Sequence, residues 1–388
     1  MTTSRPAAVI VLAAGEGTRM KSDLPKVLHT IGGRSLLGHA IAAARALDPV
    51  HLAVVVRHER DRVAAHIREC DPDCVVADQD EVKGTGRAVE CGLEALPADL
   101  AGTVVVTYGD VPLLSGETLR EVVHAHEDGR YAVTVVTTEV ADPAGYGRIV
   151  RDAEGLVARI VEQKDATEQE RAICEINSGI YAFDATLLRA ALAQLTTDNA
   201  QGEKYVTDVL GIARSGGARV GAFALADYWQ CEGVNDKVQL ARLGAELNRR
   251  TVENAMRAGA IVIDPATTWI DADVSVGTDT VIHPNSQVLG ATTIGAGAVI
   301  GPDTTLRDME VGDGASVVRT HAELSVVGAG CTVGPWAHLR PGTELGPDSL
   351  VGSFVETKNV VAAAGSVIPQ LTYVGDTTIE GQAAGPGE

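Results

Sequence analysis

Aromatic side chains are scarce in this 388-residue chain, which holds 3 tryptophans, 7 tyrosines and 3 phenylalanines against 42 glycines. So few rings exclude a conventional aromatic-rich core and favour a fold built from tight turns and small aliphatic side chains. At this length two or three domains of ordinary size are expected, each able to bury a core of its own.

Positive charge is also in short supply. The chain has 32 Lys and Arg residues against 52 Asp and Glu residues, a formal net charge of -20. A surface of this sign repels nucleic acids and anionic membranes, which argues against either as a partner. Any phosphate binding must therefore depend on local basic patches.

Cysteine is scarce and scattered, without Cys-x-x-Cys spacing or histidines at zinc-ligand intervals, so reduced and mostly buried thiols are expected. No segment is long enough to span a bilayer, and the short apolar run Ala7 to Ala14 has no signal-peptide cleavage site. A cytoplasmic protein is expected. The six cysteines are Cys70, Cys74, Cys91, Cys174, Cys231 and Cys331.

The segment that follows the first apolar run is the most informative part of the chain. Residues 8–12 read as a short buried strand, and Gly15 and Gly17 allow a tight turn whose backbone N–H groups can face a polyphosphate. Arg19 and Lys26 add positive charge beside this turn. The pattern indicates nucleotide chemistry.

Two familiar phosphate loops do not fit this segment. A dinucleotide-binding fold needs a third glycine where Met20 stands, and a P-loop needs Gly-Lys-Ser/Thr, which is absent. A plain strand-to-helix connection with two incidental cations is the remaining structural alternative.

The first two thirds of the chain alternates apolar strands with segments of helical periodicity. This order is typical of a mostly parallel, doubly wound α/β sheet, in which ligands bind beyond the carboxyl ends of the strands. Strands are expected at Val9–Leu12, Leu52–Val56, Val104–Tyr108, Ala132–Thr137 and Gly179–Phe183, and helices at Ser35–Ala46 and Glu117–His126.

A six-residue repeat begins after residue 260. Such periodicity predicts a left-handed parallel β-helix, because each repeat supplies one face of a triangular coil and stacks its aliphatic residue on the next coil. The register breaks between Asp308 and Ala329, where a loop or bulged coil is expected. The repeat positions are Val276, Ile282, Val288, Ile294, Ile300 and Leu306, then Val327, Val333, Leu339, Leu345 and Val351.

These patterns divide the chain into four parts. We expect a nucleotide-binding domain over 1–235, a helical linker over 236–260, the β-helix over 261–376 and a flexible tail over 377–388.

The segment Leu-x-x-Gly-x-Gly-Thr-Arg-Met-x-Ser-x-x-Pro-Lys-Val-Leu, which begins at Leu12, resembles the signature of the sugar-1-phosphate nucleotidylyltransferases. From Ala8 to Asp376 the chain resembles the bifunctional N-acetylglucosamine-1-phosphate uridylyltransferase/glucosamine-1-phosphate acetyltransferase family. The resemblance implies a Rossmann-like domain that makes UDP-N-acetylglucosamine from UTP and N-acetylglucosamine-1-phosphate, in cell-wall and peptidoglycan synthesis.

The resemblance also implies a magnesium site. Asp110 follows an apolar strand in Tyr-Gly-Asp-Val-Pro-Leu, and Asn235 lies in Glu-Gly-Val-Asn-Asp. A strand-end aspartate can merely cap a turn. Together, however, the two oxygen donors suit Mg²⁺, which takes few protein ligands and completes its shell with phosphate and water.

Other site residues follow from the family pattern, position by position. Arg87 stands where the family has histidine, and this departure is expected to alter nucleotide binding modestly. For the uridine, the matching residues are Leu12, Ala13, Ala14, Gly15, Gln79, Gly84 and Thr85, and Gln79 could read the base through both amide groups. For the sugar, they are Tyr108, Gly109, Gly145, Glu162, Asn177, Tyr205 and Thr207.

The chemistry implied needs no protein nucleophile, because a sugar phosphate oxygen attacks the α-phosphorus of UTP directly. Arg19 and Lys26 would be the catalytic cations: Arg19 would stabilise the leaving pyrophosphate, and Lys26 the phosphate of the sugar.

The acetyltransferase half of the family pattern is incomplete. Arg340, Lys358 and Tyr373 match, but Gln370 stands at the position of the catalytic histidine, and Val367 replaces a lysine. A glutamine amide cannot accept a proton from an amine near neutral pH. By the same resemblance, the later coils that carry the family's acetyl-CoA site are not expected in the sequence after Asp376. Acetyl transfer is therefore expected to be lost, leaving the β-helix as a homotrimeric stalk.

Three functions remain open. The first is a monofunctional uridylyltransferase that supplies a cell-wall or specialised-metabolite pathway. The second is a nucleotidylyltransferase for a related hexosamine phosphate or another NTP, for which Arg57 and Arg87 are weak indications. The third is a non-catalytic subunit that regulates a full-length paralogue, against which Arg19, Lys26 and Asp110 are all retained.

Overall fold

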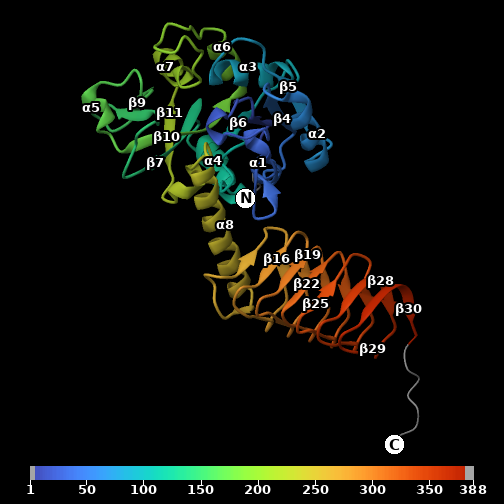
Figure 1. Ribbon diagram of the computed structural model, residues 1–388. Coiled ribbons are helices and arrows are strands. Elements are labelled where there is room, and N and C mark those ends of the chain that lie inside the picture. The colour runs from blue at the N-terminus through green and yellow to red at the C-terminus, as the bar shows by residue number, and fades with distance from the viewer. Residues whose placement is uncertain (1–4, 381–388) are drawn as a thin grey trace, which may run out of the picture. The chain divides into compact units, whose positions relative to one another are not determined.

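The computed structural model describes residues 5–380 (Figure 1). Contacts divide the chain into two compact units, one of residues up to Thr30 with Ser35–Leu243, and one of Ile31–Arg34 with the residues from Gly244 on. The division falls inside helix α8 (Lys237–Arg257), within the stretch that the sequence suggests as a separate linker. Among the described residues, no helix combines the length and apolarity that a membrane span requires.

The first unit is built on a mixed sheet with strand order β11-β7-β10-β6-β1-β4-β5. Strands β6, β1, β4 and β5 run parallel, while β10 is antiparallel to both β6 and β7. The strands are β1 (Ala8–Leu12), β4 (His51–Val56), β5 (Val75–Asp78), β6 (Thr103–Tyr108), β7 (Val133–Glu139), β10 (Glu175–Asp184) and β11 (Val220–Ala224), with β8 (Arg148–Arg151), β9 (Val157–Val161) and the small pair β2 (Thr30–Ile31) and β3 (Arg34–Ser35) beside them.

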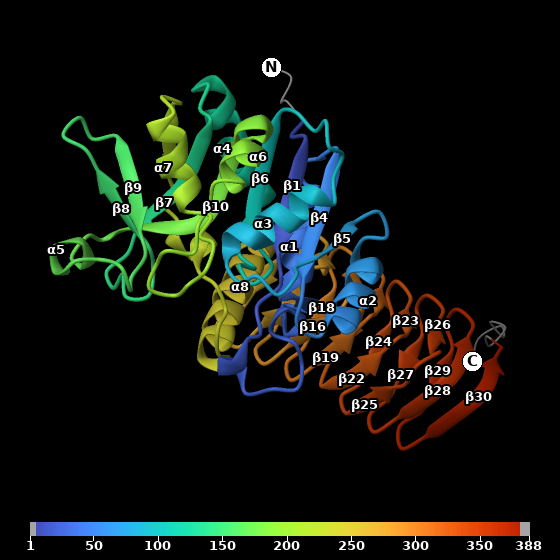
Figure 2. The same ribbon diagram turned by 90° about the horizontal axis from the view of Figure 1, so that it is seen from above.

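Helices cover both faces of this sheet (Figure 2). Successive side chains of a strand point to opposite faces, so Ile10 joins one buried cluster and Val9 and Val11 join the other. Helices α3 (Thr85–Glu94), α6 (Ala185–Leu192) and α7 (Asp208–Ser215) cover the first face, and α1 (Leu36–Arg45), α2 (Arg60–Cys70) and α4 (Gly116–Asp128) cover the second, while α5 (Glu168–Arg171) is a single turn. The predicted doubly wound α/β domain is confirmed.

Among the five predicted strands, β10 differs most from its prediction, which starts it at Gly179. It begins at Glu175, and its pairing with β7 shifts register between Asn177 and Tyr181. Gly179 lies in this irregularity with φ of 83°, a conformation that favours glycine. A Cβ there would lie 2.4 Å from the Tyr108 ring.

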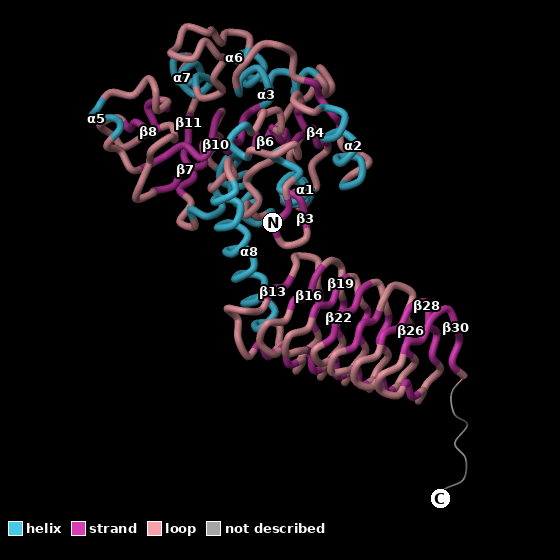
Figure 3. The backbone as a smooth tube through the Cα atoms, in the orientation of Figure 1, coloured by secondary structure: helices cyan, strands magenta, loops and turns pink. Residues whose placement is uncertain are grey.

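The second unit is the predicted left-handed parallel β-helix (Figure 3). Its first face holds β12 (Ile261–Val262), β15 (Val281–Ile282), β18 (Val299–Ile300), β21 (Ser316–Val317), β24 (Thr332–Val333), β27 (Leu350–Val351) and β29 (Val367–Ile368). The second holds β13 (Trp269–Ile270), β16 (Gln287–Leu289), β19 (Thr305–Arg307), β22 (Thr320–Glu323) and β25 (Ala337–Leu339). The third holds β14 (Ser275–Val276), β17 (Thr293–Ile294), β20 (Glu310–Val311), β23 (Val326–Val327) and β26 (Glu344–Leu345), and the long strands β28 (Glu356–Ala362) and β30 (Tyr373–Ile379) continue both of the last two faces.

The repeat positions form the core of this helix, and nearly all of them are buried, Val276 being partly exposed. The prediction of a loop or bulged coil after Asp308 is wrong. The strands pair 18 residues apart at Val281 and Val299, 17 apart at Thr293 and Glu310, and only 16 apart at Thr305 and His321. The coil shortens at its corners, and the buried stack continues through Val311, Val317 and Ala322.

The predicted tail is too long at its start. Residues 377–379 belong to β30, where Thr377 pairs with Val360 and Ile379 packs against the core. An apolar side chain at the spacing of the coil can still stack, which is why the strand extends this far. Residues 381–388 of the predicted tail lie outside the described residues.

The cysteines agree with the prediction. Cys74, Cys91, Cys231 and Cys331 are buried, Cys70 and Cys174 are exposed, and no disulfide joins any of these six described residues.

Candidate active site

A polar pocket of about 360 Å³ lies in the first unit, where β6 and β10 contribute residues to its wall. The carboxyl end of β6 is next to that of β1, since Leu12 pairs with Tyr108. This is the edge at which ligands bind in parallel sheets. Nine of the predicted site residues line the pocket: Arg19, Thr85, Tyr108, Asp110, Gly145, Glu162, Asn177, Thr207 and Asn235.

The glycine turn lies beside this pocket without lining it, apart from Arg19. Its start is fixed to the sheet, because Gly109 N–H donates to the Leu12 carbonyl over 2.9 Å. Gly17 has φ of 65°, and a Cβ there would lie 2.5 Å from Cβ of Lys26. Glycine at this position therefore lets the turn approach the segment that carries Lys26.

Lys26 joins the two predicted metal ligands. Its ammonium group forms an ion pair with Asp110 Oδ2 and lies 3.4 Å from Asn235 Oδ1. Two hard oxygen donors from distant parts of the chain thus converge on one positive charge. The oxygen donors and their convergence both fit a divalent cation with few protein ligands. Among the described residues no group of three or more His, Cys, Asp or Glu forms a fuller cage.

Gln239 fixes this arrangement and was not predicted. Its Oε1 accepts from the backbone N–H of Asn235 over 2.7 Å, and the side chain also lines the pocket. The N–H of Val234 donates to the Asp110 carbonyl over 2.9 Å, tying the two ligand segments together. The one sequence signal for Gln239 was its position four residues after Asn235.

Gln79 follows β5 and holds the loop that leads into α3. Its Nε2 donates to the carbonyls of Val82, at 3.0 Å, and Gly84, at 3.3 Å. The amide nitrogen is therefore engaged by the loop, and the expectation that both amide groups read the base has to be corrected. Only Oε1 remains for a ligand.

The unusual Arg87 faces carboxylates. It pairs with Asp80 at 2.8 Å, Glu90 at 2.8 Å and Glu94 at 3.0 Å, and these partners raise the pKa of Arg87 further above its usual value. Such pairing occupies the guanidinium within the protein, so Arg87 holds the start of α3 in place.

The backbone of Gly84 is tightly enclosed and supports a first prediction. Its φ is 114°, and a Cβ would lie 2.2 Å from the Lys204 carbonyl oxygen. We expect Gly84→Ala to lower the free energy of unfolding by about 3 kcal/mol and to raise the KM for the nucleotide at least about tenfold. Urea unfolding and initial-rate kinetics measure both.

Gly202→Ala is the matched control for that variant. Gly202 also has a positive φ, 65°, but nothing lies within 4 Å of a Cβ there. If both variants lose the same stability, conformational strain alone explains the effect, and the proposed collision with Lys204 is wrong.

The other end of the pocket carries Glu162, Thr207 and two tyrosines. Glu162 accepts from Thr207 Oγ1 over 3.4 Å, and burial raises the pKa of this carboxyl group. Burial also raises the pKa of Tyr146 to about 12 and raises that of Tyr108. A partly desolvated carboxylate and two neutral phenols provide the mixed polar surface on which a sugar can bind.

A buried arginine supports the loop before this surface. Arg148 lies beneath it, donating to the Tyr146 carbonyl and, over 2.7 Å, to Gln163 Oε1. Gln163 Oε1 also accepts from the N–H of Gly145 over 3.3 Å. Arg148 lies three residues after Gly145 in the sequence, and nothing in the sequence signals this supporting role.

Glu162 supports a second prediction. Because burial raises the folded-state pKa, the carboxyl contributes stability below its usual value of 4.5, and that contribution is lost as pH rises through the folded pKa. We expect Glu162→Gln to match wild type in melting temperature at pH 4.5 and to exceed it by about 2–4 °C at pH 8. Differential scanning fluorimetry checks this. The exposed Glu154→Gln serves as the control, and an equal gain in both variants would contradict the burial argument.

Two predicted sugar residues lie outside the pocket wall. Gly109 is packed between Leu37 and Ala13, with 3.0 Å and 3.2 Å left for a Cβ. Tyr205 is buried, and its hydroxyl accepts from Gln201 over 2.8 Å. The structure therefore does not place Gly109 or the Tyr205 side chain in the pocket wall to which Glu162 and Asn177 contribute.

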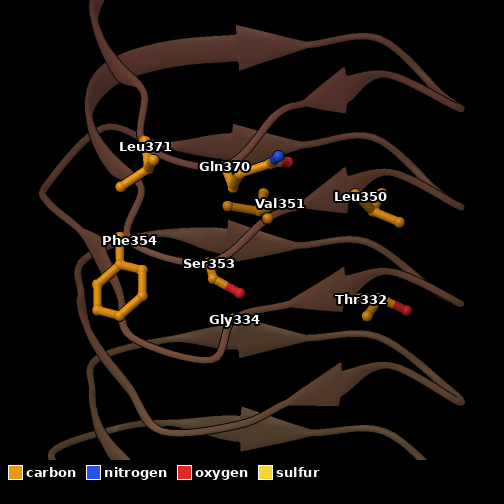
Figure 4. A pocket seen from close by; sticks show the side chains of 9 residues that line it. Thr332, Gly334, Leu350, Val351, Ser353, Phe354, Gln370 and Leu371 are labelled. Carbon is orange, nitrogen blue, oxygen red and sulfur yellow. The ribbon is translucent and has the colours of Figure 1, made fainter.

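The four residues predicted as a vestigial acetyltransferase site all belong to the second unit. Gln370 lines a mostly apolar groove of about 440 Å³ together with Leu350, Phe354 and Leu371 (Figure 4). Arg340, Lys358 and Tyr373 do not line this groove. Arg340 pairs instead with Glu356 at 3.1 Å, and Tyr373 stands beside Glu356 on the next strand.

Comparison with known proteins extends this picture. Residues 9–204 match the model of the MobA-like NTP transferase domain, and residues 273–308 match that of the bacterial transferase hexapeptide with six repeats. These matches agree with a nucleotidyltransferase domain followed by a β-helix.

Curated relatives match nearly the whole chain. Proteins called bifunctional protein GlmU are 61% identical in Pseudarthrobacter chlorophenolicus, 58% in Rhodococcus opacus and 56% in Corynebacterium glutamicum, each over 96% of this chain. The match covers 76%, 76% and 77% of these relatives, respectively.

A solved structure shares the fold. A putative glucose-1-phosphate thymidylyltransferase from Bacillus anthracis, in complex with a sucrose, superposes with a TM-score of 0.50 at 19% identity. The match covers 62% of this chain and 94% of that one.

Proposed function

This chain belongs to the family of bifunctional GlmU proteins, and from that membership we propose that it transfers a uridylyl group from UTP to N-acetylglucosamine-1-phosphate. The products are UDP-N-acetylglucosamine and pyrophosphate. The observation that carries the proposal is the convergence of Lys26, Asp110 and Asn235 beside a polar pocket at the carboxyl end of the sheet. A nucleotidyltransferase needs this combination of cation and oxygen donors where the phosphates meet.

Binding and charge neutralisation account for the reaction. The phosphate oxygen of the sugar attacks the α-phosphorus in line, so the protein has to hold two anions together and stabilise the charge that moves to pyrophosphate. Lys26 holds the sugar phosphate, and Arg19, exposed at the pocket, stabilises the leaving group. Glu162, Asn177 and Thr207 orient the sugar at the other end.

Asp110 and Asn235 would hold the metal, which we propose to be Mg²⁺. When bound, it would neutralise phosphate charge and fix the relative orientation of the two substrates. In the structure Lys26 already satisfies both oxygen atoms, so this lysine keeps the two ligands together until its own phosphate partner arrives.

We further propose that acetyl transfer is lost, although the relatives are bifunctional by name. Gln370 supports this proposal, because no basic side chain stands at the position of the family's catalytic histidine. The β-helix then serves as the contact surface of a homotrimer, whose mass light scattering would give as three times that of the chain.

The direct test is pyrophosphate release with UTP, Mg²⁺ and either N-acetylglucosamine-1-phosphate or glucosamine-1-phosphate. Faster turnover with the acetylated sugar is the expected result. Turnover with a different hexosamine phosphate or NTP would favour a changed substrate. Silence with a full panel of sugar phosphates and NTPs would favour the regulatory subunit and overturn the proposal.

A further inference from the structure

The side-chain amide of Asn177 has a fixed orientation. Its Oδ1 lies 3.0 Å from the backbone nitrogen of Gly179 and 2.9 Å from the hydroxyl of Tyr181. A backbone N–H can only donate, so the amide atom facing it must be the oxygen. That oxygen in turn makes the Tyr181 hydroxyl a donor.

The backbone of β10 creates this contact. The register shift between Asn177 and Tyr181, with Gly179 at φ of 83°, turns the N–H of Gly179 back toward the Asn177 side chain. Without a side chain at Gly179, the Tyr108 ring can lie against the same turn. The irregularity of the strand thus positions both the asparagine and the pocket wall.

Tyr181 is rigidly held beneath the pocket. It is 1% exposed, pairs with Val106 of β6 and Val135 of β7, and stacks on Phe183 with 5.2 Å between ring centres. Asn177 lines the pocket, whereas Tyr181 does not. The phenol therefore reaches a ligand only through the asparagine.

We propose that Tyr181 is a positioning residue that makes Asn177 a hydrogen-bond donor toward the substrate. With Oδ1 occupied twice, the Nδ2 hydrogens are left for an acceptor oxygen, a hydroxyl or carbonyl oxygen of the sugar. The inference rests on the proposed function, because it assigns this end of the pocket to the sugar phosphate. A site that held the amide in the opposite sense would present an acceptor instead.

Tyr181→Phe tests this directly. Without the phenol hydrogen the amide is held by one contact instead of two, and we expect the KM for the sugar-1-phosphate to rise about tenfold. The KM for UTP should stay within about twofold, because the nucleotide end is untouched. Tyr131→Phe, which removes a hydroxyl from a tyrosine outside this pocket, should change neither constant.

A double-mutant cycle separates positioning from simple packing. If Tyr181 acts through Asn177, then Tyr181→Phe should add little to the effect of Asn177→Ala on the KM for the sugar. Additive effects, or an equal rise in both KM values, would overturn the inference.

Should Tyr181→Phe fail to fold, Asn177→Asp replaces it. The carboxylate keeps both contacts at oxygen but has no hydrogens to donate, and an unchanged KM for the sugar would overturn the inference.

The wild-type enzyme in the same assay distinguishes the two proposals. Normal turnover combined with an unchanged KM in Tyr181→Phe rejects only the role of Tyr181. A wild type that is silent with every sugar phosphate rejects the proposed function, and the role of Tyr181 is rejected with it.

Discussion

Replacing Asp110 by asparagine should lower kcat/KM for pyrophosphate release at least about thousandfold, which corresponds to about 4 kcal/mol of lost transition-state stabilisation. The substitution keeps the shape of the side chain and removes its charge. Asp110 pairs with Lys26, whose ammonium group also lies 3.4 Å from Asn235 Oδ1. Its charge therefore serves both the predicted metal and the lysine that binds phosphate. Steady-state kinetics with UTP and the sugar phosphate gives the ratio.

A second readout shows whether the loss comes from the cation. Mn²⁺ titration followed by electron paramagnetic resonance, in the presence of UTP, should show weakened binding in Asp110→Asn and wild-type binding in Asp61→Asn, whose carboxylate is 95% exposed. Wild-type metal binding in Asp110→Asn would show that the charge of Asp110 serves Lys26 and not the metal. A variant that retains more than about a tenth of wild-type activity would contradict the phosphoryl-transfer role of Asp110.

The positions of this site could be predicted from the sequence better than its contacts. Asp110 lies two residues after a buried strand, and the ends of parallel strands gather at one edge of the sheet, so its neighbourhood follows from the fold. The bridge from Lys26 to Asp110 and Asn235 does not follow, because it depends on how a long flexible side chain turns. The prediction for Gln79 was wrong for a related reason, because nothing in the sequence indicates that its amide nitrogen donates hydrogen bonds to the following loop.

The β-helix shows the same limit in its backbone. A regular six-residue spacing predicts stacked strands because each aliphatic residue must meet its equivalent in the next coil. Where single residues are missing at the corners, the six-residue spacing is lost until the stack resumes. The same interruption of the spacing predicts a loop or a bulged coil. Val311 and Ala322 show that the core accepts five-residue steps, since each remains buried. A bulge and a deletion interrupt the sequence in the same way but have opposite effects on the coil.

The chain should transfer acetyl groups to glucosamine-1-phosphate at least about a hundredfold more slowly than an active acetyltransferase in the same assay, because general bases contribute factors of about 10²–10⁴. Release of the CoA thiol, followed with a thiol reagent, measures this reaction. Pyrophosphate release by the same preparation shows that the protein is folded and active. Acetyl transfer at a rate close to that of the reference enzyme would show that Gln370 does not disable the site.

Gln370→His tests whether the missing base alone accounts for the expected loss. The side chain is exposed and lies on the groove with Leu371 and Phe354, so a histidine fits there without disturbing the core. A gain of about a hundredfold or more would show that the base was the missing part. A variant that stays silent would show that one base is not enough, and Val367, exposed on the same coil where the family has lysine, is the next position to restore. Uridylyl transfer should be unchanged in both variants, because neither residue lies in the first unit.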